Sequence, residues 1–335
     1  MSEFIHNQTA HCENGVTLSL LKNQGLEFMT EPLAFGIGSG LFYIHIPFMK
    51  VNNGPAISFR TIPGLIFRRT CKLLGVHMVT RKFRSHEEAQ SVLEDLLKKG
   101  IPVGCQVGVY HLVYFPKEYR FHFNAHNLIV FGKEEGRYLI SDPTMEMTTS
   151  LLPEELDKVR FAKGAFAPKG RVNYVLSAKD VTNEKLKSAI KKGISRNCQF
   201  MLKIPGGIAG AKGINYTAKQ IEGWREKYGE KQAALHLGQI VRMQEEIGTG
   251  GGGFRFLYAA FLDQASEIFG NDQLLKISDK ITQSGDLWRD SAMQMSGIYK
   301  GRLNTQKDYL DTANLLREIS ALEKEAFQEL KRIKL

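Results

Sequence analysis

The sequence predicts an α+β domain over residues 1–177, followed by a mostly α-helical domain over residues 178–335. The first half mixes helix-type patterns with short apolar runs bounded by glycines, and helical spacing dominates from about residue 178. A length of 335 residues also suits two domains of roughly 100–200 residues each. With 43% hydrophobic and 24% charged residues, the chain has globular rather than disordered composition.

Two helices are predicted in the first half. Residues 13–23 form a short apolar pattern that ends near a glycine, and residues 86–99 form a clearer amphipathic one. Ser85 is suited to cap the second helix, acidic residues follow in its first turn, and Gly100 is suited to end it. Local sequence alone therefore predicts both helices, and the capping signals also predict the ends of the second.

Strands are predicted around these helices. Residues 41–48 and 101–115 are apolar runs that follow glycine-containing loops or a helix. Residues 126–131 and 137–142 flank the turn sequence KEEG, which predicts a β-hairpin. In the second half, residues 309–335 carry apolar side chains at helical spacing opposite a charged face.

Cys12 differs from the other three cysteines, which lie inside apolar runs. It has polar neighbours and directly precedes a predicted helix, where the positive end of the helix dipole stabilises a thiolate. The alternative is an ordinary thiol near the chain terminus. No two cysteines have the close spacing of a redox or zinc motif, and cytosolic thiols usually stay reduced.

The predicted hairpin supplies partners for this thiol. If Gly132 faces Arg137 or Gly136, then Asp142 lies opposite His126 or one residue from it. A carboxylate so placed can orient the imidazole, which can in turn take the proton of a thiol. Asp-Pro is also a common turn opener, and a strand histidine can be purely structural. The combination with Cys12 favours a catalytic interpretation.

The order Cys, His on a strand, Asp on the next strand is that of papain-like thiol enzymes. Residues 11–30, GIGSGL at 36–41, the IPV strand and HFNAHNLIVFG…YLISDP resemble the butirosin biosynthesis protein H N-terminal family. The segment GTGGGGFRFLYAAFLDQAS resembles the helical domain that usually accompanies it. The resemblance implies a papain-like fold and an acyltransferase like its namesake, which moves an aminoacyl group from an acyl carrier protein to an aminoglycoside amine.

This resemblance also implies residue roles: Cys12 as nucleophile, His126 as base and Asp142 as its orienting partner. Papain-like enzymes place an oxyanion donor, usually Gln, shortly before the cysteine. Gln8 lies four residues before Cys12, and the backbone N–H of Cys12 is the other candidate. His122 shares strand parity with His126, so both could project from one face and His122 competes for the role of base. His126 is preferred because the unbroken apolar strand starts there, and His122 is kept as a candidate substrate contact.

A zinc site is the alternative use of the N-terminal histidines. It would combine His6, His11, Cys12 and His122, but no pair of these has a recognisable ligand spacing. We therefore expect no bound metal and no bound cofactor, since a thioester donor arrives already activated on its own phosphopantetheine arm.

Two glycine-rich segments are candidate substrate contacts. Gly38 and Gly40 belong to a G-x-G-x-G stretch that lacks the dinucleotide-binding pattern and would let a thioester arm approach closely. Gly252 and Arg255 lie at a predicted helix start, where N–H groups can bind an anionic acceptor group. The structural alternatives are a flexible turn and an interhelical hinge.

The net charge of +10 has a local source. Between Glu31 and Glu87 there are eight basic and no acidic residues. Acyl carrier proteins are generally acidic, so this block is a candidate docking face. Its candidate contacts are Arg68, Arg69, Lys72 and Arg81. The alternative is basic side chains scattered over different faces, and no nucleic-acid-binding motif accompanies the charge.

The sequence thus predicts a cytoplasmic acyltransferase with an amine or hydroxyl acceptor, without a membrane span or secretory signal. A thiol hydrolase acting on a thioester, amide or peptide shares the first half-reaction and is the runner-up. A carrier-protein-binding module that has lost the chemistry is the second alternative. An exposed apolar face on the helical half would indicate a homo-oligomer.

Overall fold

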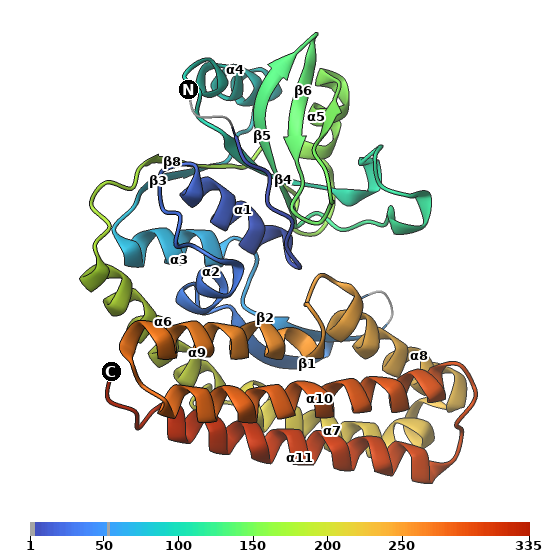
Figure 1. Cartoon of the computed structure of the whole chain (residues 1–335). Coiled ribbons are helices and arrows are strands. Elements are labelled where there is room, and N and C mark those ends of the chain that lie inside the picture. The colour runs from blue at the N-terminus through green and yellow to red at the C-terminus, as the bar shows by residue number, and fades with distance from the viewer. Residues whose placement is uncertain (1–3, 52–53) are drawn as a thin grey trace. The chain divides into compact units, whose positions relative to one another are not determined.

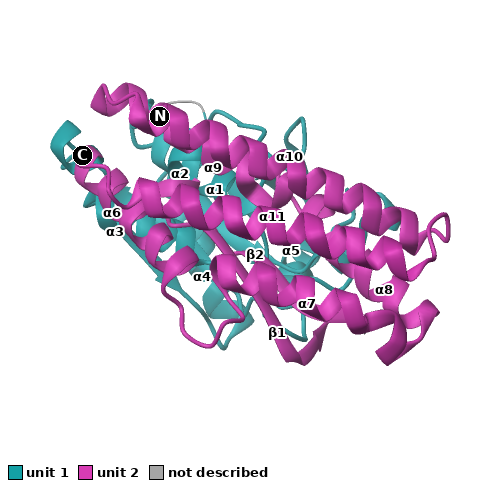
Figure 2. Cartoon of the chain, turned by 90° about the horizontal axis from the view of Figure 1, so that it is seen from below, with its two compact units in different colours: residues 1–34, 63–186 teal, residues 35–62, 187–335 magenta. Residues whose placement is uncertain are grey.

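The computed structural model describes residues 4–51 and 54–335 and divides the chain into two compact units (Figure 2). Unit 1 comprises residues 1–34 and 63–186, and unit 2 comprises residues 35–62 and 187–335. This division differs from the two contiguous halves predicted from the sequence, because residues 35–62 group with the C-terminal helices. Their strands pack on α7 and α8 of unit 2 rather than joining the sheet of unit 1.

Unit 1, as far as the structure describes it, is built on an antiparallel sheet with strand order β3-β8-β4-β5-β6-β7 (Figure 1). Helices α4 and α5 pack on its buried apolar side chains, among them Val103, Leu128 and Ile140, and α1 and α3 also contact strands of the sheet. The elements are α1 (Cys12–Lys22), α2 (Glu31–Ile37), which crosses the unit boundary after residue 34, α3 (Leu65–Leu74), β3 (His77–Arg81), α4 (His86–Lys98), β4 (Val103–Val107), β5 (His126–Glu134), β6 (Arg137–Ser141), β7 (Thr149–Leu151), α5 (Pro153–Arg160) and β8 (Val172–Ser177).

Local capping signals place the second predicted helix correctly. Helix α4 begins at His86, and the Ser85 side chain accepts a hydrogen bond of 3.1 Å from the backbone N–H of Glu88. The chain leaves the helix through Gly100, whose φ of 70° suits glycine. The predicted strand over residues 101–115 is much shorter, because β4 ends at Val107 and the short 3-10 helix η1 (Val109–His111) follows.

The β5–β6 hairpin is present, but its predicted register is wrong. Gly132 pairs with Leu139 instead of facing Arg137 or Gly136. The turn consists of Glu135 and Gly136 alone, with φ of 47° and 77°, which is the tight geometry that twisted hairpins favour. An irregularity just before Gly132 then shifts the pairing by one residue.

Unit 2 is mostly helical, as predicted for the second half (Figure 1). Helices α7, α10 and α11 are long and lie side by side, and the β1–β2 hairpin packs on α7 and α8. The elements are β1 (Leu41–Val51), β2 (Gly54–Arg60), α6 (Asn183–Leu202), α7 (Gly210–Tyr228), α8 (Glu230–Val241), η3 (Arg242–Glu246), η4 (Gly252–Phe254), α9 (Arg255–Phe269), α10 (Gln273–Tyr299) and α11 (Gln306–Leu330).

Arg255 is part of a buried ion pair, not an exposed anion-binding group. Its Nε and Nη2 donate to the two carboxylate oxygens of Glu323 at 2.8 and 3.0 Å, and both side chains are fully buried. Ser284 and Trp288 donate to the same carboxylate. The predicted role in binding an acceptor is therefore replaced by a structural one. The nearby N–H of Gly252 donates to the chain's own Glu245 carboxylate, at 3.1 Å.

Removing one partner of this pair is expected to cost stability. In Glu323→Gln the guanidinium of Arg255 stays buried without a counter-charge, and we expect the free energy of unfolding to fall by about 3–5 kcal/mol. Urea denaturation followed by circular dichroism measures it. The double variant Arg255→Met/Glu323→Met is expected to recover most of the loss. A loss below about 1 kcal/mol in the single variant would contradict a buried pair.

Within the described residues, no helix combines the length and apolar character that crossing a membrane requires. The same part of the chain holds no group of three or more His, Cys, Asp or Glu residues placed to bind a metal ion.

Candidate active site

Cys12 is the first residue of α1 and is only 7% exposed. The turn before it is held by Glu31, whose carboxylate accepts hydrogen bonds from the backbone N–H groups of Ala10 and His11 at 3.0 and 2.9 Å. The His11 side chain caps the helix by accepting from the N–H of Asn14. The N–H of Cys12 itself, in the first helical turn, has no acceptor within the helix. The thiol thus lies beside a backbone donor that the helix itself does not use.

His126 and Asp142 meet despite the shifted register. His126 begins β5, Asp142 directly follows β6, and His126 Nε2 lies 2.7 Å from Asp142 Oδ2. The Asp142 side chain is fully buried and that of His126 is 7% exposed. Tyr114 donates its hydroxyl to the same Oδ2 at 2.8 Å, and Thr144 donates its N–H and hydroxyl to Oδ1. These bonds fix the carboxylate against the imidazole.

The electrostatics of this pair favour its charged form. Burial alone lowers the pKa of His126, but the nearby Asp142 and Cys12 outweigh it and raise the pKa well above its ordinary 6.5. Burial likewise raises the pKa of Asp142, while the charge of His126 and the hydrogen bonds to the carboxylate bring it below 3.8. A hydrogen bond between His126 and Cys12 contributes. Because Nε2 faces Asp142, Nδ1 is the ring nitrogen left for the thiol.

Three residues of this site were not identified from the sequence. Asn127 follows His126 directly, and its Nδ2 lies 3.8 Å from Cys12 Sγ. Thr144 follows the Asp-Pro turn, so its position beside Asp142 was a local signal that the sequence offered. The contact of Tyr114 could not be predicted, because the segment that carries it was predicted to be a strand and is in fact a loop after η1.

Other predicted contacts lie elsewhere. Gln8 is exposed, whereas Asn127 is the amide that approaches the thiol. His122 is exposed and stacks on Tyr110 with ring centroids 4.2 Å apart. His6 uses both ring nitrogens, one on the Ser141 hydroxyl and one on a backbone carbonyl. The alternative zinc site is therefore not assembled in the described part of the chain.

The glycines of the G-x-G-x-G stretch are buried packing residues of unit 2. Gly38 and Gly40 are both buried, and a Cβ on Gly40 would come within 2.2 Å of the Phe35 ring. A Cβ on Gly36 would similarly meet Phe261, at 2.1 Å. Close packing within unit 2 is thus a sufficient reason for glycine here, independent of any ligand.

The candidate docking residues lie on two elements of unit 1. Arg68 and Lys72 are exposed on α3, and Arg69 beside them is half-buried. Arg81 is exposed on β3 but pairs with Glu88 of α4, which offsets its charge. The exposed positive charge of this group therefore comes mainly from α3.

A helix with a cysteine at its N-terminus, beside an antiparallel sheet with paired His and Asp, is the papain-like arrangement, and the predicted fold class is confirmed. The profile of the family described as butirosin biosynthesis protein H, N-terminal, matches residues 11–143. The profile of a second family, described as domain of unknown function (DUF4872), matches residues 154–330.

Comparison with curated proteins gives no match. Among solved structures, one described as a C39-like peptidase from Bacillus anthracis aligns with 16% sequence identity and a TM-score of 0.36. The alignment covers 53% of this chain and 96% of the peptidase chain.

Proposed function

The chain belongs to the DUF4872 family, and its residues 11–143 match the butirosin biosynthesis protein H N-terminal family. From these matches we propose that it is a cysteine-dependent acyltransferase. Its donor is an acyl or aminoacyl thioester on an acyl carrier protein, and its acceptor is an amine or hydroxyl of a small molecule. The observation that carries the proposal is the buried, hydrogen-bonded His126–Asp142 pair beside Cys12, which itself contributes to the raised pKa of His126. Such a pair serves covalent catalysis by a thiol.

In the first half-reaction the Cys12 thiolate attacks the thioester carbonyl carbon. The bond between that carbon and the donor sulfur breaks, and the phosphopantetheine thiolate takes a proton from the His126 imidazolium. The N–H of Cys12 and Nδ2 of Asn127 are the candidate donors for the oxyanion. The donor brings its own phosphopantetheine, so this step requires no bound cofactor.

In the second half-reaction the acceptor attacks the acyl-enzyme and transfers a proton to His126 Nδ1. An amide or ester forms, the carbon–sulfur bond to Cys12 breaks, and the thiolate returns. Water competes as an acceptor and would release the free acid. Asp142 keeps the imidazole oriented through both steps and stabilises its positive charge.

The experiment combines a panel of acyl carrier protein thioesters with intact-protein mass spectrometry, with and without amine acceptors such as an aminoglycoside. We expect an acyl adduct on the protein and conversion to an acylated acceptor. Release of free acid at the same rate without any acceptor would instead identify a hydrolase. Folded protein without an adduct from any thioester would favour a carrier-protein-binding module.

Charge reversal on α3 tests the partner separately. In Arg68→Glu/Lys72→Glu we expect kcat/KM with a carrier-protein donor to fall about ten-fold at low salt, because electrostatic steering is lost. A short thioester without the protein should react at the same rate in both proteins. Equal losses with both donors would show that these residues support the fold or the site instead of docking.

A further inference from the structure

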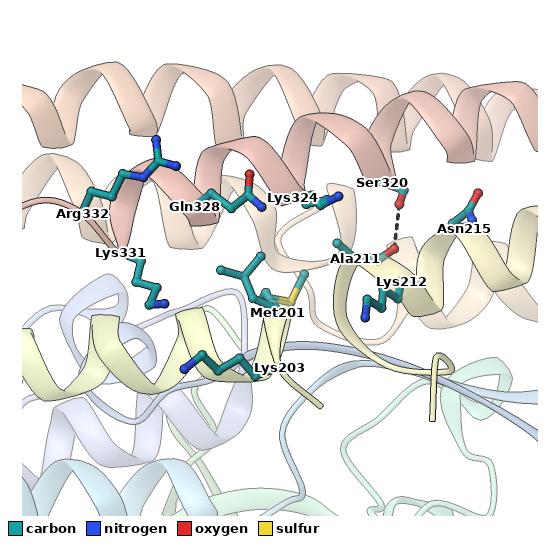
Figure 3. A pocket seen from close by; sticks show the side chains of 11 residues that line it. Met201, Lys203, Ala211, Lys212, Asn215, Ser320, Lys324, Gln328, Lys331 and Arg332 are labelled. Atoms are coloured by element: carbon teal, nitrogen blue, oxygen red, sulfur yellow. Dashed lines mark hydrogen bonds between the residues drawn. The ribbon is translucent and has the colours of Figure 1, made fainter. Parts of the chain in front are cut away.

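A cavity of about 550 Å³ lies within unit 2, where the end of α6, the first turn of α7 and the last turns of α11 meet (Figure 3). Its size falls in the range of small-molecule sites, roughly 300–1,000 Å³. The lining residues are Met201, Leu202, Lys203, Ala211, Lys212, Asn215, Ser320, Lys324, Gln328, Lys331 and Arg332. This cavity was not anticipated from the sequence and belongs to none of the contacts described above.

The cavity wall is cationic. It contains four lysines and one arginine, and no acidic residue lines it. The acids of the same stretch of α11 are committed elsewhere: Glu323 pairs with Arg255, while Glu325 and Glu329 both pair with Lys280. Among the residues that the structure describes, none of the five wall cations forms an ion pair. All five residues are exposed, so their charge is open to a ligand from solution.

Helix ends explain only part of this charge. Lys203, Lys331 and Arg332 follow the C-termini of α6 and α11, where cations are ordinarily favourable. Lys212 is instead in the first turn of α7, at the positive end of the helix dipole, and Lys324 lies within α11. A cation at a helix N-terminus is electrostatically unfavourable unless an anion binds nearby. The N-cap residue of α7, Ala209, also supplies no side-chain acceptor.

The rest of the wall suits a ligand that is both charged and organic. Met201 and Leu202 provide apolar surface, and Asn215 and Gln328 provide amide groups for hydrogen bonding. The Ser320 hydroxyl donates to the Ala211 carbonyl at 2.7 Å and so ties α11 to the first turn of α7. Figure 3 shows the labelled lysine and arginine side chains coming from all three segments of the wall.

We propose that this pocket binds a small molecule that carries phosphate groups, with Lys212 and Lys324 as its principal phosphate contacts. Phosphate oxygens accept several charge-assisted hydrogen bonds at once, which a wall of lysines can supply. The proposal concerns unit 2 alone and goes beyond acyl transfer. It holds or fails independently of the chemistry at Cys12.

Isothermal titration calorimetry on the full chain tests it, with inorganic pyrophosphate and coenzyme A as probes at about 0.15 M ionic strength. We expect saturable binding of at least one probe with one ligand per chain. In Lys212→Ala/Lys324→Ala the affinity should fall at least about ten-fold, because two charge-assisted contacts are lost. The matched control is Lys276→Ala/Lys300→Ala, which removes the same charge from exposed positions outside the pocket and should stay within about two-fold.

Equal losses in both double variants, or no saturable binding of either probe, would overturn the proposal. Circular dichroism and melting curves establish that each variant is folded. Binding to Cys12→Ala chains is expected to equal that of the wild type. Because calorimetry requires no turnover, it distinguishes failure of the proposed acyl transfer from failure of the proposed ligand binding.

Discussion

Replacing Cys12 by alanine is expected to abolish acyl-enzyme formation and to lower the transfer rate by about 10⁴-fold or more. The reason is that no other group in the site can form the covalent intermediate, and loss of a nucleophile removes the whole pathway rather than one interaction. Intact-mass analysis after mixing with a thioester donor measures the adduct. Single-turnover kinetics measure the rate.

The other cysteines make this test specific. Burial raises the pKa of Cys71 and Cys105, and raises that of Cys198 to about 12, so these thiols stay protonated near neutral pH. Peptide mapping should therefore find the acyl group on Cys12 alone. The matched control Cys105→Ala removes a thiol from the core and should still form the adduct. An adduct of undiminished yield on Cys12→Ala would refute the mechanism.

The three residues of the candidate site were predictable because their signals are local. Cys12 precedes a helix-forming run, and His126 and Asp142 flank one hairpin, so short-range patterns bring them near one another. Their exact juxtaposition was not predictable from counting, because a two-residue turn and an irregularity before Gly132 shift the register. Asp142 still reaches His126, since a position just past the end of β6 lies beside the start of β5.

Residues whose roles depend on distant partners were misjudged. Arg255 next to a glycine run suggests an anion site, but Glu323 is 68 residues further along the chain and no local pattern predicts their pairing. Tyr114 was missed for a similar reason, because the loop after β4 brings its hydroxyl to Asp142, a residue 28 positions later in the chain. Residues 35–62 join unit 2 through packing on helices about 170 residues later in the sequence. Tertiary contacts of this kind determine which side chains are buried, and burial in turn determines which polar side chains can still contact a substrate.

Asp142→Asn is expected to lower the acylation rate by about 10³–10⁴-fold while leaving Cys12 in place. The amide keeps the shape of the carboxylate but neither stabilises the imidazolium nor enforces the same tautomer of His126. Tyr114→Phe is the matched comparison, because it removes one hydrogen bond to Asp142 and keeps the charge. We expect it to cost about ten-fold, in line with one hydrogen bond to a charged group.

The pH profile separates a charge effect from a structural one. Asp142 raises the pKa of His126 above 6.5, so the imidazolium stabilises the fold fully below the unfolded pKa and loses this effect as pH rises through the folded pKa. In Asp142→Asn, burial and the effect of Cys12 remain but the attraction to Asp142 is gone, so the pKa of His126 falls. Acylation uses the His126 imidazolium to protonate the leaving thiolate, so the alkaline limb of the single-turnover acylation rate should move to lower pH in Asp142→Asn but not in Tyr114→Phe. If Asp142→Asn reacts slowly but its alkaline limb stays at the wild-type pH, then Asp142 orients the His126 ring without setting its charge.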